Sequence, residues 1–90
     1  MTDDELKAKA WADLEDDINC HGPYVGRIYR HYKGGLYTVE AISIMEDTLA
    51  PLVTYRSNIR ETSTTRTLGN FTNHVTHEGR LVPRFQWVNE

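Results

Sequence analysis

Apolar side chains recur every three to four residues over the first twenty positions of the chain, which indicates one face of an amphipathic helix. Thr2 and Glu5 have the spacing of a capping box, in which a hydroxyl and a carboxylate satisfy free amides of the first turn. Gly22 and Pro23 favour the end of the helix. We therefore predict a helix over residues 2–19. Its apolar stripe consists of Leu6, Ala10, Trp11, Leu14 and Ile18.

From residue 24 onward, short runs of β-branched and aromatic residues alternate with turn formers, a pattern that is typical of strands. Residues 33–35 and 78–79 contain the glycines expected of hairpin turns. The Ser-, Thr- and Arg-rich residues 58–67 predict an exposed loop, and the turn that follows is expected to bring Phe71 into the core. Pro83 cannot donate to a ladder, so it places the last strand at an edge or a bulge. The predicted strands are residues 25–32, 36–44, 52–57, 72–77 and 80–88.

About five short strands after one helix predict an α+β, mostly β fold. Two architectures fit this pattern: a small, strongly bent antiparallel sheet and an SH3-like barrel. Because 90 residues suffice for one domain, we expect a single domain over residues 1–90 with a strand-rich core over residues 24–88. The helix is expected to cover an open end or face of the sheet with Trp11 and Leu14.

Composition indicates the setting of the protein. No apolar run approaches the roughly 20 residues that a membrane helix needs, and the polar, acidic N-terminus does not resemble a secretory signal. The single cysteine, Cys20, cannot form an internal disulfide. We therefore expect a cytoplasmic protein that makes no membrane contact.

Charge is distributed unevenly along the chain. Residues 1–17 carry seven acidic residues against Lys7 and Lys9, a net charge of −5, whereas residues 18–90 carry eight basic residues against six acidic ones, a net charge of +2. Seven of those eight are arginines, whose planar guanidinium grips phosphate or carboxylate in bidentate fashion. Either these arginines are solvated on strands, or a few of them line an anion site.

The first strand carries the most distinctive candidate chemistry. Side chains alternate between the two sides of a strand. If Ile28 faces the core, then Tyr29, His31 and Lys33 share an exposed side that is both basic and aromatic. Such a surface suits a ligand with a flat base and a phosphate, through stacking and charge-assisted hydrogen bonds. The alternative is that the tyrosines pack within the sheet and His31 is an ordinary surface residue.

The same residue types return in later strands as Tyr55, Arg56, Arg66 and Arg84. Arg56 has a structural alternative, an ion pair with Glu40. Arg84 has one as well, since it can pack on its aromatic neighbours or pair with a carboxylate. The candidate ligand-binding residues are Tyr29, Arg30, His31, Lys33, Tyr55, Arg56, Arg66 and Arg84.

Residues 26–34, Gly-Arg-Ile-Tyr-Arg-His-Tyr-Lys-Gly, and residues 82–85, Val-Pro-Arg-Phe, resemble two motifs of the family catalogued as domain of unknown function 1653. The family occurs as short proteins or domains in bacteria and their phages. The resemblance extends over residues 25–88 and implies no known activity. This chain departs from the family pattern at residues 63–67, which lack the family's tryptophan and proline. The acidic helix is also no part of the family's core pattern.

Catalytic and metal chemistry find little support in the sequence. His74 and His77 would point to opposite sides of a strand, which makes a poor pair of metal ligands. There is no glycine-rich phosphate loop before a helix and no Gly-x-Ser-x-Gly motif. Cys20 follows a helix end, where the helix dipole disfavours a thiolate. We expect a non-enzymatic protein with no catalytic residues, no metal and no cofactor.

The leading hypothesis is therefore a small binding protein for an anionic, nucleotide-like ligand, and in a phage such a protein could sequester a defence signal. The alternative is a protein–protein adaptor or inhibitor that acts through its acidic N-terminal helix. Nucleic-acid binding is disfavoured by the net charge of −3. We expect a homodimer, because two-fold symmetry is the commonest oligomeric arrangement.

Overall fold

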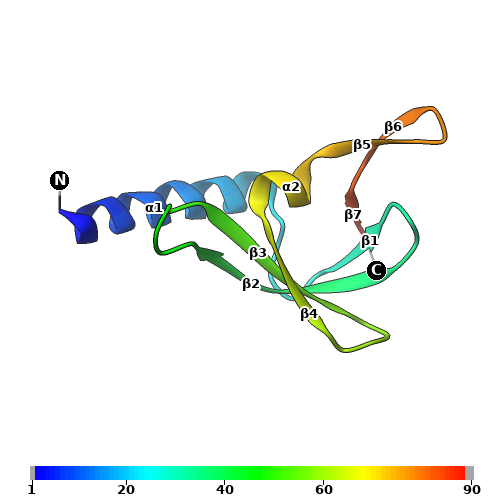
Figure 1. Cartoon of the computed structure of the whole chain (residues 1–90), viewed down its shortest axis with the longest axis horizontal. Helices are drawn as coiled ribbons and strands as arrows, with labels where there is room; N and C mark the ends of the chain where they lie inside the picture. Colours follow the sequence, from blue (N-terminus) through cyan, green and yellow to red (C-terminus); the bar gives the residue numbers. More distant parts are fainter. Residues whose placement is uncertain (1, 89–90) are drawn as a thin grey trace.

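The fold combines one long helix, an open sheet and a separate two-stranded ribbon (Figure 1). A computed structural model describes residues 2–88. The elements are α1 (Asp3–His21), β1 (Ile28–His31), β2 (Leu36–Ile44), β3 (Pro51–Ser57), β4 (Ser63–Thr67), α2 (Leu68–Thr72), β5 (His74–His77), β6 (Arg80–Pro83) and β7 (Phe85–Trp87).

Helix α1 is capped at its start by Thr2 and at its end by Gly22, the residues from which its two ends were predicted. The Thr2 hydroxyl accepts from the Glu5 amide at 3.2 Å and donates to the Glu5 carboxylate at 3.1 Å. Gly22 takes a positive φ of 71°, and its amide donates to the Ile18 carbonyl at 2.8 Å, which closes the last turn. The predicted helix is thus confirmed and extends two residues beyond residue 19.

The main sheet is antiparallel, with strand order β4-β3-β2-β1-β7, and β5 pairs with β6 apart from it. Gly34, at a φ of 114°, lies in the turn of the β1–β2 hairpin. A register shift between Val39 and Ala41 marks a bulge in β2. The strands at the two edges, β4 and β7, do not pair with each other, so the sheet is not closed. The α+β, mostly β prediction is confirmed, and of its two architectures the open sheet is found, not the barrel.

Two of the predicted segments were wrong. Residues 58–67 are not all loop, because Ser63–Thr67 forms β4 and pairs with β3. Ser and Thr favour loops, but β-branched threonines equally suit an edge strand whose side chains are mostly exposed. The last predicted strand also divides in two. Pro83 ends β6, which pairs with β5, and the chain then pairs β7 with β1.

The core lies between one side of the sheet, α2 and the middle of α1. Phe71, on α2, is 2% exposed, as predicted, and stacks on Phe85 with ring centroids 4.1 Å apart. The Thr67 hydroxyl caps α2 by accepting from the Asn70 amide at 3.2 Å. The buried core residues are Leu14, Tyr29, Val39, Val53, Tyr55, Leu68, Phe71 and Phe85.

Helix α1 meets the core through Leu14, which is buried, and Ile18, which packs against it. Trp11 is 38% exposed and is not among the side chains that form or pack against the core, so of the two predicted residues Leu14 is the one that the core includes. Figure 1 shows the N-terminal part of α1 extending past the sheet at one end, with the β5–β6 ribbon projecting at the other. Neither described helix is long and apolar enough to cross a membrane.

Candidate functional site

Strand β1 exposes different side chains from those predicted. Tyr29 and His31 share one side of the strand, but it is the core side, since Tyr29 is only 6% exposed and Ile28 is half-buried. The Tyr29 hydroxyl accepts from the Tyr24 amide at 2.9 Å. Burial raises the pKa of this phenol. A tyrosine can bury its ring once its hydroxyl has a partner, so Tyr29 is a structural residue.

His31 lies at the border between this core and solvent. Its ring centroid is 5.0 Å from that of Phe85, 4.5 Å from Tyr32 and 6.2 Å from Tyr37. The Lys33 amide donates to Nδ1 at 3.1 Å, which leaves Nε2 as the protonated nitrogen of the neutral imidazole. His31 therefore presents one free donor from a half-buried, aromatic setting.

Arg66 comes to the same side of the sheet from β4. Arg66 pairs with Val53, a core residue of β3, so the two side chains leave the backbone on the same side of the sheet, the side that faces the core. Its Nε donates to the Tyr55 hydroxyl at 3.3 Å. The Tyr55 ring is buried, with its centroid 5.1 Å from Phe85. Tyr55 thus holds the Arg66 guanidinium in place, while its own ring belongs to the core.

Arg84 joins the main sheet to the segment between α2 and β5. Its Nε donates to the Asn73 side-chain oxygen at 2.8 Å, and its amide donates to the Asn73 carbonyl at 2.9 Å. Its own carbonyl accepts from the Tyr32 amide at 2.9 Å. Three hydrogen bonds therefore fix Arg84 beside the β1–β2 hairpin, and its Nε partner is an amide oxygen, not a carboxylate.

The positive charges converge on His31. Burial lowers the pKa of this imidazole most, and the charges of Arg66, Arg84 and Lys33 lower it further. Among residues 2–88, none of the seven arginines lies within ion-pair distance of a described carboxylate. We call His31, Tyr55, Arg66 and Arg84 the inner cluster. Its positive charge is uncompensated within the described part of the chain.

Two of the predicted site residues lie on the other side of the sheet. Arg30 is exposed opposite Gln86 and lines a cleft of about 240 Å³ beside the β5–β6 ribbon. Arg56 is exposed opposite Thr38 and lines a separate polar hollow of about 250 Å³. Glu40 accepts from Ser63 and forms no ion pair with Arg56. Arg30 and Arg56 therefore lie across the sheet from Tyr55 and Arg66, whereas His31 lines the same cleft as Arg30.

Lys33 is exposed in the hairpin turn, with Nζ 5.7 Å from the Tyr32 ring centroid. It is close enough to influence His31 but is held by no ion pair to a described acid. The eight predicted residues thus divide into the inner cluster, the flanking Lys33, the structural Tyr29, and Arg30 and Arg56 across the sheet.

Asn73 and Tyr37 are two contributors that sequence reasoning missed. Tyr37 lies beside His31 and Phe85, and we call Tyr37, Tyr55 and Phe85 the aromatic wall. The sequence marked Tyr37 as a residue of the predicted strand 36–44 and gave no sign of its place in the site. Asn73 orients Arg84 from the C-cap position of α2, and no pattern along the chain marks it.

The inner cluster offers hydrogen-bond donors and aromatic surface. The Nε atoms of Arg66 and Arg84 donate to Tyr55 and Asn73, and the terminal guanidinium nitrogens make no hydrogen bond to the described residues. Within residues 2–88 no group of three or more His, Cys, Asp and Glu side chains is placed to hold a metal ion. The chemistry that the cluster supports is charge-assisted binding of an anion.

A family model described as a protein of unknown function (DUF1653) matches residues 27–87. The chain belongs to the DUF1653 family. It is similar to the crystal structure of a DUF1653 protein from Bordetella bronchiseptica, at 26% sequence identity and a TM-score of 0.65, over 72% of this chain and 87% of that one. No match was found among curated proteins. The inner cluster of this DUF1653 chain lies within the matched residues, whereas α1 lies outside them.

Proposed function

We propose that this DUF1653 protein binds a small anionic, nucleotide-like ligand at the inner cluster and performs no chemistry on it. The observation that supports the proposal most is geometric. Arg66 is hydrogen-bonded to Tyr55, whose ring packs on Phe85. Arg84 directly precedes Phe85, which packs on the half-buried His31. No described carboxylate lies within ion-pair distance of either arginine. Uncompensated charge in a partly desolvated setting attracts an anion more strongly than the same charge in bulk water does.

The hydrogen bonds around the arginines favour binding without large rearrangement. Arg66 and Arg84 are each anchored through Nε, so fewer rotamers need to be frozen when a phosphate binds their terminal nitrogens. A guanidinium and a phosphate form short, bidentate, charge-assisted hydrogen bonds. The neutral His31 ring adds one donor at Nε2.

Aromatic residues beside these donors suit the flat part of a nucleotide. Tyr37 is half-buried, and its ring centroid lies 5.8 Å from Phe85 and 5.4 Å from Tyr55. A base can stack on a ring at this wall while its phosphate contacts the guanidinium groups. Phosphate and base recognition would then come from neighbouring groups on one side of the sheet.

A thermal-shift screen of mononucleotides, dinucleotides and cyclic nucleotides tests the proposal. A ligand present at a hundred times its Kd stabilises the folded state by about 2.7 kcal/mol, which corresponds to a rise on the order of 10 °C for a domain of this size. We expect at least one nucleotide class to give such a rise, with inorganic phosphate giving less. If no nucleotide at millimolar concentration raises the Tm, the proposal is wrong.

A binder that leaves its ligand unchanged would act by sequestration, which fits the role of a phage protein that removes a defence signal. The screen's best ligand should therefore be recovered chemically intact after incubation and heat denaturation of the protein. Recovery of a hydrolysed product would instead indicate an enzyme.

A further inference from the structure

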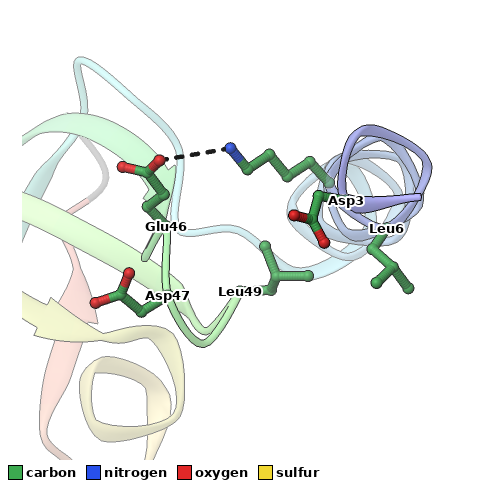
Figure 2. Close-up of a pocket in the computed structure, with 6 residues that line it drawn as sticks. Asp3, Leu6, Glu46, Asp47 and Leu49 are labelled. Atoms are coloured by element: carbon green, nitrogen blue, oxygen red, sulfur yellow. Dashed lines mark ion pairs between the residues drawn. The ribbon is translucent and has the colours of Figure 1, made fainter. Parts of the chain in front are cut away.

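Two hollows follow α1 along the side that faces the rest of the molecule. The first, of about 330 Å³, lies near the start of the helix and is lined by Asp3, Leu6, Lys7, Glu46, Asp47 and Leu49 (Figure 2). The second, of about 290 Å³, continues with Ala10, Asp13, Leu14 and Asp17 and reaches Leu68 of α2. Leu49, in the β2–β3 loop, lines both hollows. We call the two together the α1 groove.

The helix positions that line this groove are spaced three and four apart, from Asp3 to Asp17. Such spacing marks a single face of a helix. Helix α1 has 19 residues and is about 28 Å long. The groove therefore runs along most of one face of α1.

Little holds the groove closed at its outer end. The ion pair between Lys7 Nζ and a Glu46 carboxylate oxygen is 3.7 Å long, and the two side chains are 40% and 83% exposed. An ion pair with this exposure contributes little stability. Figure 2 shows the pair joining the helix to the loop at Glu46, with Leu49 between the loop and the helix. The space can thus admit another chain without loss of a buried contact.

The chemistry of the groove combines an apolar floor with an acidic rim. Leu14, Leu49 and Leu68 supply the floor. Five carboxylates and one lysine supply the rim: Asp3, Asp13, Asp17, Glu46, Asp47 and Lys7. Large apolar side chains stay exposed nearby, with Leu6 39%, Trp11 38% and Met45 45% accessible. Glu46 pairs with Lys7 and Asp13 pairs with Lys9. Asp3, Asp17 and Asp47 make no described ion pair. Apolar surface beside such acids is typical of a docking surface for a basic partner.

We propose that the α1 groove docks a basic amphipathic helix of a partner protein. A helix fits because its apolar side chains at three- and four-residue steps can follow the line of the groove. Lysines and arginines on either side of that apolar stripe would meet the acidic rim. A second copy of this chain fits poorly, because its own long helix is equally acidic and would set carboxylates against carboxylates.

The proposal does not depend on anion binding at the inner cluster. The groove lies on α1 and the β2–β3 loop, and α1 falls outside the residues that the family model matches. The two binding functions can therefore be lost separately. The groove would give this protein a partner that DUF1653 chains without such a helix do not share.

A labelled peptide tests the groove directly. The probe is an 18-residue helix of leucine and lysine, with leucines spaced three and four apart, and its control has the same composition in scrambled order. Asp17→Asn with Asp47→Asn removes two exposed rim charges, and Glu15→Gln with Asp16→Asn removes two exposed charges that line neither hollow. None of these four acids makes a described ion pair, so neither variant should disturb folding.

Fluorescence anisotropy should show the amphipathic peptide binding at least tenfold more tightly than the scrambled one. We expect the rim variant to weaken this binding about tenfold and the matched variant to change it less than twofold, while nucleotide binding stays the same in both. The proposal is overturned if the peptide does not bind or if both variants weaken it equally. It is also overturned if sedimentation shows a dimer that the peptide cannot dissociate, since a second copy would then fill the groove.

Discussion

At the scale of single residues, the partner of each polar group decides whether a side chain is structural or available. Tyr29 and Tyr55 are both buried tyrosines whose hydroxyls are satisfied, one by a backbone amide and the other by Arg66. Of the two, Tyr55 is the one whose hydroxyl links the core to a charged side chain, that of Arg66. The sequence predicts the residue types of the site. It does not reveal that Tyr29, rather than Ile28, faces the core, because either residue can be buried.

The lowered pKa of His31 makes a prediction about stability against pH. Burial and the neighbouring positive charges hold the folded pKa of His31 below the ordinary histidine value, so the unfolded chain takes up more protons as the pH falls through that region. The free energy of unfolding therefore decreases on acidification. Replacing His31 with Asn should flatten the fall of the Tm between about pH 7.5 and 5.5, the range in which histidine titrates.

His74→Asn is the matched control, since His74 is exposed on β5 and makes no described side-chain hydrogen bond. It should keep the slope of the unaltered protein. Equal slopes for the His31 variant and the unaltered protein would show that His31 is not held neutral by its surroundings.

At the scale of elements, the sequence predicted the helix and strands that have a strong local pattern. The other elements depend on contacts between segments that are distant in the sequence. Capping chemistry gave the start of α1, and the β-branched run gave the bounds of β2. β4 was missed because its Ser and Thr residues are all exposed, so the strand shows no alternation of apolar and polar positions. The division between β6 and β7 depends on which strands they meet, β5 and β1, and that pairing is non-local.

Helix α2 is short, and its role is to place Phe71 in the core. The ring of Phe71 stacks on Phe85 and lies 5.6 Å from Tyr29 and 5.5 Å from Tyr55, centroid to centroid. Phe71→Ala should reduce the free energy of unfolding by about 3–5 kcal/mol, as in other phenylalanine truncations that leave a cavity. Ile59→Ala, at a residue that is 86% exposed, should change it by less than about 0.5 kcal/mol.

Urea unfolding of both variants measures this difference. A loss below about 1 kcal/mol for Phe71→Ala would mean that the aromatic core repacks around the gap and that α2 does not anchor the wall beside the inner cluster.

At the scale of the whole molecule, opposite charges are kept apart. The acidic helix lies along the β2–β3 loop, whereas the inner cluster is built from β1, β3, β4 and the segment before β7. The sequence predicted this separation as a difference in net charge between residues 1–17 and 18–90. It did not predict that the sheet places Arg30 and Arg56 on the opposite side from Arg66, because register alone decides the side. The expected homodimer stays a prediction.

The measurement that tests the inner cluster most directly is calorimetric titration of the best nucleotide from the screen into two charge-matched variants. Arg66→Gln with Arg84→Gln removes both cluster arginines, and Arg56→Gln with Arg60→Gln removes two exposed arginines that lie outside the inner cluster and outside the cleft that His31 lines. We predict that the first variant weakens binding at least a hundredfold and the second less than threefold, because each charge-assisted contact contributes about 1.5–3 kcal/mol. Equal losses in the two variants would contradict a site at the inner cluster.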